Sequence, residues 1–104
     1  MTKVLVADDD PLTMAGITTL LDKTNFTVVA TVNTGAAVLD ALPGARPELL
    51  ILDNDMPERS GLDVLRTLRS KGDDRPVVLL TSRLNDELAR EAVKLSVNGI
   101  WSAR

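Results

Sequence analysis

The chain has 104 residues, a formal net charge of −3 at pH 7, and neither cysteine nor histidine. These values exclude a disulfide framework, zinc coordination of the usual kind and a histidine base, and the negative charge disfavours direct binding of nucleic acid. Apolar residues make up 44% of the chain, and nearly all are aliphatic, because Phe26 and Trp101 are the only aromatic residues. The composition predicts one cytoplasmic domain, residues 1–104, with an aliphatic core and no membrane span.

Five short apolar or β-branched runs are separated by segments with helical periodicity. The runs predict strands at residues 3–7, 26–32, 48–53 and 77–80, and a fifth strand that begins at Ile100. The segments between them predict four helices, one after Pro11, one at residues 36–42 that Pro43-Gly44 ends, one after Gly61 and one after Asn85. Strands and helices that alternate in this order indicate an α/β fold with a parallel sheet.

Polar and charged side chains on the predicted helices have simple structural interpretations. Helix caps are predicted at Asp10, at Asn85 and at either Asn33 or Thr34. A solvent-exposed face with local ion pairs, such as Asp63–Arg66, is predicted for Arg59, Arg66 and Arg69.

Three of the predicted strands end at polar residues. An unbroken aliphatic run ends at Asp53, the first strand ends at Asp8 and Asp9, and the fourth ends at Thr81. Because the carboxyl ends of parallel strands share one edge of the sheet, we expect these side chains to converge. Two carboxylates about 4 Å apart repel by about 4 kcal/mol at an effective dielectric constant of about 20, and a Mg²⁺ ion would offset that repulsion.

This arrangement predicts a phospho-accepting site. Asp53 would act as the nucleophile, the metal would offset charge on the transferring oxygens, and the Thr81 hydroxyl would bind a phosphoryl oxygen. A backbone carbonyl near Asp55 would supply another metal ligand.

The segments VLVADDDP, LLILDNDMPERSGLDVL and PVVLLTS, at these spacings, resemble the receiver domain of bacterial two-component response regulators. The resemblance covers the whole chain and implies a flavodoxin-like, doubly wound parallel sheet of five strands in the order 2-1-3-4-5. It implies that Asp53 is the phospho-acceptor, that Asp9 binds Mg²⁺ directly and Asp8 through water, and that the Asp55 carbonyl is a further ligand. It also implies that Thr81 is the switch hydroxyl.

The same resemblance implies roles for two further positions and shows two departures. The Asp55 and Arg83 side chains fall where receivers tune dephosphorylation, and their opposite charges could pair. The lysine that receivers carry after the fifth strand falls at Ala103, with Arg104 next to it. The aromatic switch position falls at Ile100, whereas Trp101 faces the other side unless a bulge or register shift brings Trp101 and Arg104 into both roles.

The final helix of the family is absent from the chain. We therefore expect either a fragment of a longer protein or a sheet face left open for a partner or a second copy, as in a homodimer. The resemblance implies a sensor histidine kinase as partner and admits a DNA-binding output domain beyond this chain.

The leading functional interpretation is a phosphorylation-dependent switch. Such a switch is not an enzyme, since it catalyses at most its own phosphorylation and dephosphorylation. One alternative is a pseudo-receiver that acts as a protein–protein interaction module without phosphorylation, and the missing lysine favours it. Another is a haloacid-dehalogenase-type phosphatase with a D-x-D motif at Asp53 and Asp55. Those enzymes carry threonine or valine two residues after the second aspartate, where this chain has Pro57.

Overall fold

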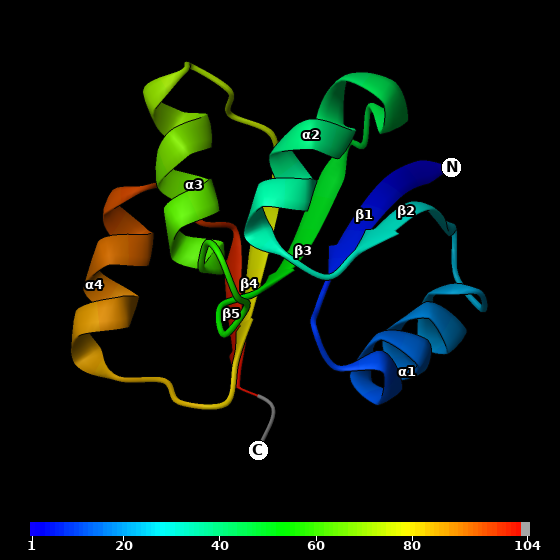
Figure 1. Ribbon diagram of the computed structural model, residues 1–104, viewed down its shortest axis with the longest axis horizontal. Coiled ribbons are helices and arrows are strands. Elements are labelled where there is room, and N and C mark those ends of the chain that lie inside the picture. The colour runs from blue at the N-terminus through cyan, green and yellow to red at the C-terminus, as the bar shows by residue number, and fades with distance from the viewer. Residues whose placement is uncertain (103–104) are drawn as a thin grey trace.

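The computed structural model describes residues 1–102, in which strands and helices alternate from β1 to β5 (Figure 1). The strands are β1 Thr2–Ala7, β2 Phe26–Val32, β3 Leu49–Asp53, β4 Val77–Thr81 and β5 Gly99–Ser102. The helices are α1 Pro11–Leu21, α2 Gly35–Ala45, α3 Gly61–Ser70 and α4 Asp86–Lys94. Every predicted element is present, with ends that differ from the predictions by at most three residues. Within residues 1–102 no helix combines the length and the hydropathy that a membrane crossing requires.

All five strands are parallel and lie in the order β2-β1-β3-β4-β5. This order confirms the flavodoxin-like sheet. The chain adds β2 on one side of β1 and the later strands on the other, so β1 and β3 are adjacent at the point where the direction of winding reverses. Strand β2 forms an edge, and its side chains are exposed or half-buried, as its threonines predict.

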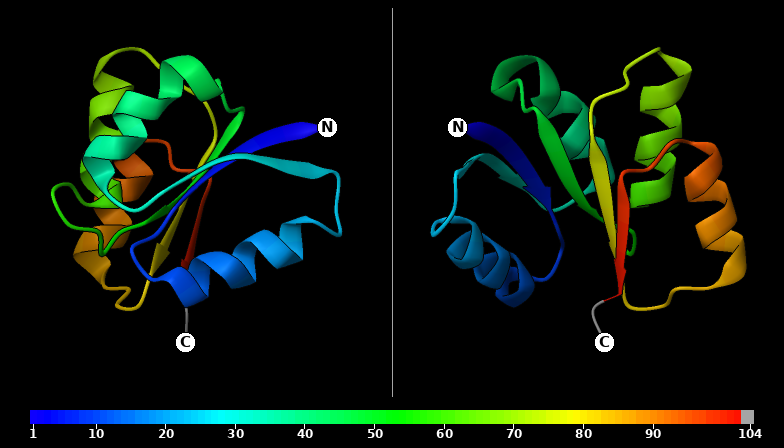
Figure 2. Two further views of the ribbon diagram at one scale, coloured as in Figure 1. Left: turned by 45° about the vertical axis from the view of Figure 1, so that its right-hand side comes forward. Right: turned by 180° about the vertical axis from the view of Figure 1, so that it is seen from behind.

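The helices cover the two faces of the sheet unequally. Helices α2, α3 and α4 pack on one face, where the largest buried cluster lies, whereas α1 lies on the other face beside β1 and β2 (Figures 1 and 2). On the α1 face, the helices within residues 1–102 leave β4 and β5 uncovered (Figure 2). Helix α1 accordingly has no buried residue, and Leu12 and Leu20 are 81% and 62% exposed.

Helix α2 is longer than predicted. The predicted stop at Pro43-Gly44 is wrong, because α2 continues to Ala45 and ends at Arg46 in the left-handed region. A proline has a helical φ, although it lacks an N–H donor and its ring crowds the carbonyl four residues earlier, and here the Arg46 N–H beyond it still donates to the Leu42 carbonyl at 2.9 Å. Thr34, not Asn33, caps the helix by accepting from the Ala37 N–H at 3.1 Å.

Arg66 and Arg69 of α3, and Arg59 in the loop before it, do not form one solvent-exposed face. Arg66 pairs with Asp63 at 2.8 Å, as predicted, and Arg59 donates to Thr67. Arg69 is different, since its guanidinium donates to four backbone carbonyls, those of Asp73, Arg75, Leu95 and Ser96, at 2.7–3.0 Å. It thereby ties the carboxyl end of α3 to that of α4, and sequence analysis missed it because helical periodicity shows only neighbours on the same helix.

Candidate functional site

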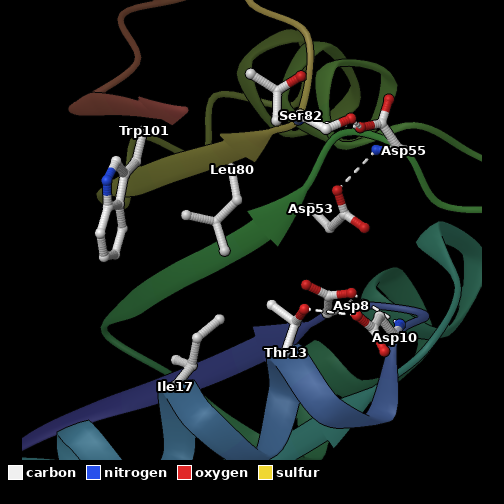
Figure 3. Close-up of a pocket in the computed structure, with 10 residues that line it drawn as sticks. Asp8, Asp10, Thr13, Ile17, Asp53, Asp55, Leu80, Ser82 and Trp101 are labelled. Carbon is white, nitrogen blue, oxygen red and sulfur yellow. Dashed lines mark hydrogen bonds between the residues drawn. The ribbon is translucent and has the colours of Figure 1, made fainter. Parts of the chain in front are cut away.

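The acidic residues predicted to converge do so at the carboxyl ends of β1 and β3. Ala7 pairs with Leu52, so the next residues, Asp8 and Asp53, lie side by side. Carboxylate oxygens of Asp8, Asp9 and Asp53 all lie within 4.8 Å of one another. Asp8 and Asp53 are nearly buried, whereas Asp9 is exposed, and Figure 3 shows the first two carboxylates facing each other across a pocket.

Backbone amides fix the two buried carboxylates. Asp8 Oδ1 accepts from the Asp10 N–H at 2.8 Å, and Asp53 Oδ1 accepts from the Asp55 N–H at 2.9 Å (Figure 3). Asp10 itself caps α1, since it accepts from the Leu12 N–H and the Thr13 hydroxyl, and those bonds lower its pKa. Its structural interpretation is therefore confirmed.

Burial and charge repulsion make the cluster unfavourable without a cation. Burial is the main cause that raises the pKa of Asp53 from 3.8 to about 6, and the charges of Asp8, Asp55 and Asp9 add to it, while the bond from the Asp55 N–H acts in the opposite direction. Burial likewise raises the pKa of Asp8, with further contributions from Asp9 and Asp10. At neutral pH the metal-free protein therefore holds like charges close together in a poorly hydrated place.

The donor set of this cluster fits a magnesium ion. Its ligand atoms are carboxylate oxygens, which hard divalent cations prefer, and the exposed Asp9 leaves the site open to the water molecules that Mg²⁺ retains. A cation would also offset the repulsion that raises the pKa of Asp53.

The loop after β3 is held in place at both of its ends. Met56 is 7% exposed and packs into the core. Asn54 accepts from the Leu62 N–H at 2.9 Å and so joins the loop to the first turn of α3. A side chain at Gly61 would place its Cβ 2.9 Å from the Asp53 carbonyl, so glycine allows α3 to begin directly against the end of β3.

Thr81 lies on the opposite side of Asp53 from β1, because β4 pairs with β3 there. It is 2% exposed and lines the same pocket as Asp8 and Asp53. Its Oγ1 accepts from the Arg83 N–H at 3.0 Å, which leaves the hydroxyl proton free to donate.

The opposite charges of Asp55 and Arg83 suggested that their side chains could pair. Within residues 1–102, however, no ion pair joins them. Asp55 Oδ2 instead accepts from the Ser82 hydroxyl at 3.1 Å and from its N–H at 3.4 Å. Ser82 is therefore a site residue that sequence analysis missed. A serine in a turn carries no sequence signal that would identify its partner 27 positions away.

Strand β5 pairs with β4 without interruption, from Val78–Gly99 to Thr81–Ser102. No bulge or register shift therefore occurs before Ser102. Ile100 packs against the core, whereas Trp101 is 61% exposed on the other face, as the alternation of side chains requires. Ala103 and Arg104, the expected lysine position and its neighbour, lie outside the described residues.

The pocket extends from the acidic cluster to Trp101. It has a volume of about 530 Å³, with Asp8, Asp53 and Asp55 at one end and Ile17, Leu80 and Trp101 at the other (Figure 3). The polar end contains the groups that could hold a cation and accept a phosphoryl group. The apolar end lies over the uncovered part of β4 and β5.

Residues 4–102 match the family model described as "Response regulator receiver domain". Among curated relatives, the chain is similar to the "Nitrate/nitrite response regulator protein homolog" of Haemophilus influenzae, with 41% identity over 76% of this chain and 38% of the relative. It is also similar to "Transcriptional regulatory protein YdfI" of Bacillus subtilis, with 28% identity over 95% of this chain and 46% of the relative. The chain spans half or less of the length of these relatives.

A solved structure shows the same fold. The crystal structure of a DNA-binding response regulator of the LuxR family from Staphylococcus aureus superposes with a TM-score of 0.92, with 98% of this chain and 86% of that chain covered. The two sequences are 23% identical, so this likeness supports the fold alone.

Proposed function

The chain belongs to the family of response regulator receiver domains, and we propose that it is a signalling switch that accepts a phosphoryl group on Asp53. The observation that carries this proposal is the position of Asp53 at the end of a buried strand, with Asp8 and Asp9 on one side and the Thr81 hydroxyl on the other. Family membership favours this function over the D-x-D phosphatase.

The proposed step is phosphoryl transfer to an Asp53 carboxylate oxygen. A phosphohistidine of a sensor histidine kinase is the donor, so the P–N bond breaks as the O–P bond of an acyl phosphate forms, and the histidine leaves with the electron pair of the broken bond. Asp53 Oδ1 already accepts from the Asp55 N–H, which leaves Oδ2 free for the attack. Thr81 would then donate its free proton to a phosphoryl oxygen.

Asp8, Asp9, Asp53 and the backbone carbonyl of Asp55 would hold a Mg²⁺ ion in this site. When bound, the ion supplies positive charge that offsets the charge on the transferring phosphoryl oxygens. The role of the chain is to hold three carboxylates together with backbone amides and burial, at a cost that the raised pKa of Asp53 reflects.

Phosphorylation is tested by incubation with Mg²⁺ and acetyl phosphate, followed by intact-mass measurement. We expect one added phosphoryl group in the wild type and none in Asp53→Asn. Asp40→Asn is the matched control, because Asp40 is an exposed carboxylate on α2 outside the pocket, and it should be phosphorylated like the wild type. An adduct that persists in Asp53→Asn would refute the assignment of the acceptor.

A second candidate is a phosphorylation-independent interaction module. It is favoured by one specific observation, namely that the sequence carries no lysine after Lys94, whereas the family resemblance places one at Ala103. Failure of the wild type to form the adduct with Mg²⁺ and acetyl phosphate would support this module and refute the switch.

We further propose that the domain controls a DNA-binding output region in a longer protein. The support is that the chain matches less than half of "Transcriptional regulatory protein YdfI", whose printed name describes regulation of transcription. Electrophoretic mobility shift of the longer gene product, with and without phosphorylation, tests this role. The receiver residues alone, with a net charge of −3, should not shift DNA.

A further inference from the structure

The proposed Mg²⁺ site includes one ligand that is a backbone carbonyl. The carboxylates of Asp8, Asp9 and Asp53 can adjust to a cation by rotation about side-chain bonds, whereas the Asp55 carbonyl takes its position from the path of the backbone. A loop that must be ordered when a ligand binds lowers the affinity for that ligand. The contacts of the residues on both sides of Asp55 therefore bear on the affinity for the ion.

Asn54, the residue before Asp55, is held both by its backbone and by its side chain. Its N–H donates to the Leu80 carbonyl at 2.7 Å and so continues the pairing of β3 with β4. Its Oδ1 accepts from the Leu62 N–H at 2.9 Å, in the first turn of α3. That turn lies so close that a Cβ added to Gly61 would be 3.2 Å from the Asn54 Cα. The side-chain amide thus joins the residue before Asp55 to α3.

The other contacts around Asp55 involve different atoms. The Asp55 N–H donates to Asp53 Oδ1 at 2.9 Å, and the Asp55 carboxylate accepts from the Ser82 hydroxyl and N–H. Met56, the next residue, is fixed by burial in the core. The backbone is therefore held on both sides of the Asp55 carbonyl, by the Asn54 side chain before it and by the Met56 side chain after it.

The first turn of α3 accepts two side-chain caps. Ser60 Oγ accepts from the Asp63 N–H at 3.1 Å, while Asn54 Oδ1 accepts from the neighbouring Leu62 N–H. Both bonds satisfy N–H groups that have no partner within the helix, so each should stabilise α3 to a similar degree. Asn54, unlike Ser60, is also adjacent in sequence to the proposed metal ligand. The two residues therefore allow helix capping to be separated from positioning of that ligand.

We propose that Asn54 is a positioning residue of the metal site, whose bond to α3 sets the position of the Asp55 carbonyl and thereby raises the affinity for Mg²⁺. This inference rests on the proposed function, which places the ion between the acidic cluster and that carbonyl. The Asn54 side-chain oxygen binds α3, so it acts on the ion through the backbone. Groups that orient metal ligands without contacting the metal typically change its affinity by about 10- to 100-fold.

Three variants separate the two roles. Asn54→Ala removes the acceptor for the Leu62 N–H. Asn54→Asp is the conservative variant, because its carboxylate keeps an acceptor in the same place. Ser60→Ala is the matched control, since it removes the other cap of the same turn and leaves residues 54–56 unchanged. Urea unfolding of each protein gives the conditions under which it is folded, and the metal titrations are made there.

Isothermal titration calorimetry with Mg²⁺ near pH 7 measures the dissociation constant of each folded protein. We expect Asn54→Ala to bind the ion about tenfold more weakly than the wild type, and Ser60→Ala to bind it as tightly as the wild type. Asn54→Asp should bind at least as tightly as the wild type, because it keeps the bond to Leu62 and adds negative charge near the cation. The measurement needs no phosphoryl donor, so it does not depend on phosphorylation of Asp53.

The outcomes distinguish this inference from the proposed function. Unchanged affinity in Asn54→Ala, with Mg²⁺ bound by the wild type, would overturn the positioning role and leave the proposed function in place. Equal weakening in Asn54→Ala and Ser60→Ala would also overturn it, since capping of α3 in general would then be the cause. Equal weakening in Asn54→Ala and Asn54→Asp would exclude the bond to Leu62. A wild type that binds no Mg²⁺ would refute the proposed metal site, and the positioning role with it.

Discussion

Replacing Asp53 by asparagine should stabilise the metal-free protein at neutral pH, although it removes the proposed acceptor. The unfolded chain releases the Asp53 proton near pH 4, whereas the folded protein releases it only at a pKa of about 6. Between these values the folded state binds more protons, so this group's contribution to stability falls as the pH rises. Each pKa unit corresponds to about 1.4 kcal/mol, which sets an upper limit of about 3 kcal/mol, and solvent at the open pocket mouth reduces it to about 1–2 kcal/mol.

The assay is urea unfolding of wild type and Asp53→Asn followed by far-ultraviolet circular dichroism, in buffers with a chelator. The variant should be more stable by about 1–2 kcal/mol near pH 7, and this difference should shrink toward zero near pH 4. Comparing the two proteins at each pH cancels the titration of the carboxyls that do not interact with Asp53. Saturating Mg²⁺ should stabilise the wild type more than the variant and so reduce the difference. A variant that is less stable near pH 7 without metal would refute the electrostatic argument.

Three further substitutions, one of them with a control variant, test the site and its supports. Asp9→Asn should reduce the rise in melting temperature that Mg²⁺ causes, and an unchanged rise in thermal scans would contradict the metal assignment. Arg69→Lys should lower the free energy of urea unfolding by about 1–3 kcal/mol, because an ammonium group cannot reach four carbonyls at once; equal stability would show that these bonds contribute little. Gly35→Ala should lower it by about 1–3 kcal/mol, since its Cβ would lie against the Arg59 carbonyl, whereas Gly44→Ala, with open space around it, should be neutral or stabilising.

The strands could be predicted because burial leaves a direct record in the sequence, whereas their order followed from the family resemblance. A parallel strand covered on both faces needs apolar side chains at every position, so Leu49 to Leu52 form an unbroken run that ends where the sheet meets the site. The end of α2 could not be predicted in the same way. Proline is a common stop signal, because inside a helix it loses its N–H bond and its ring crowds the carbonyl four residues earlier, yet α2 continues past Pro43 while its Val38 is buried in the core.

The convergence of Asp8, Asp9 and Asp53 was also predictable, because topology alone brings the ends of neighbouring parallel strands together. Pairwise polar contacts in the loops were not. Charge favoured Arg83 as the partner of Asp55, yet the turn after β4 directs the Arg83 N–H to Thr81 and brings Ser82 to Asp55. Such a choice depends on the local path of the backbone, which residue types and spacing do not determine.

The fifth strand shows that side-chain orientation follows from strand alternation once the pairing is known. Unbroken pairing from Gly99 to Ser102 places Ile100 inward and Trp101 outward. The inward side chain is therefore aliphatic and has no hydroxyl group that could move together with Thr81. The sequence also has no lysine after Lys94 to pair with a phosphoryl group. Within residues 1–102, the Asp55 charge contributes to the raised pKa of Asp53, and the Asp55 carboxylate also accepts a hydrogen bond from Ser82 in the loop after β4.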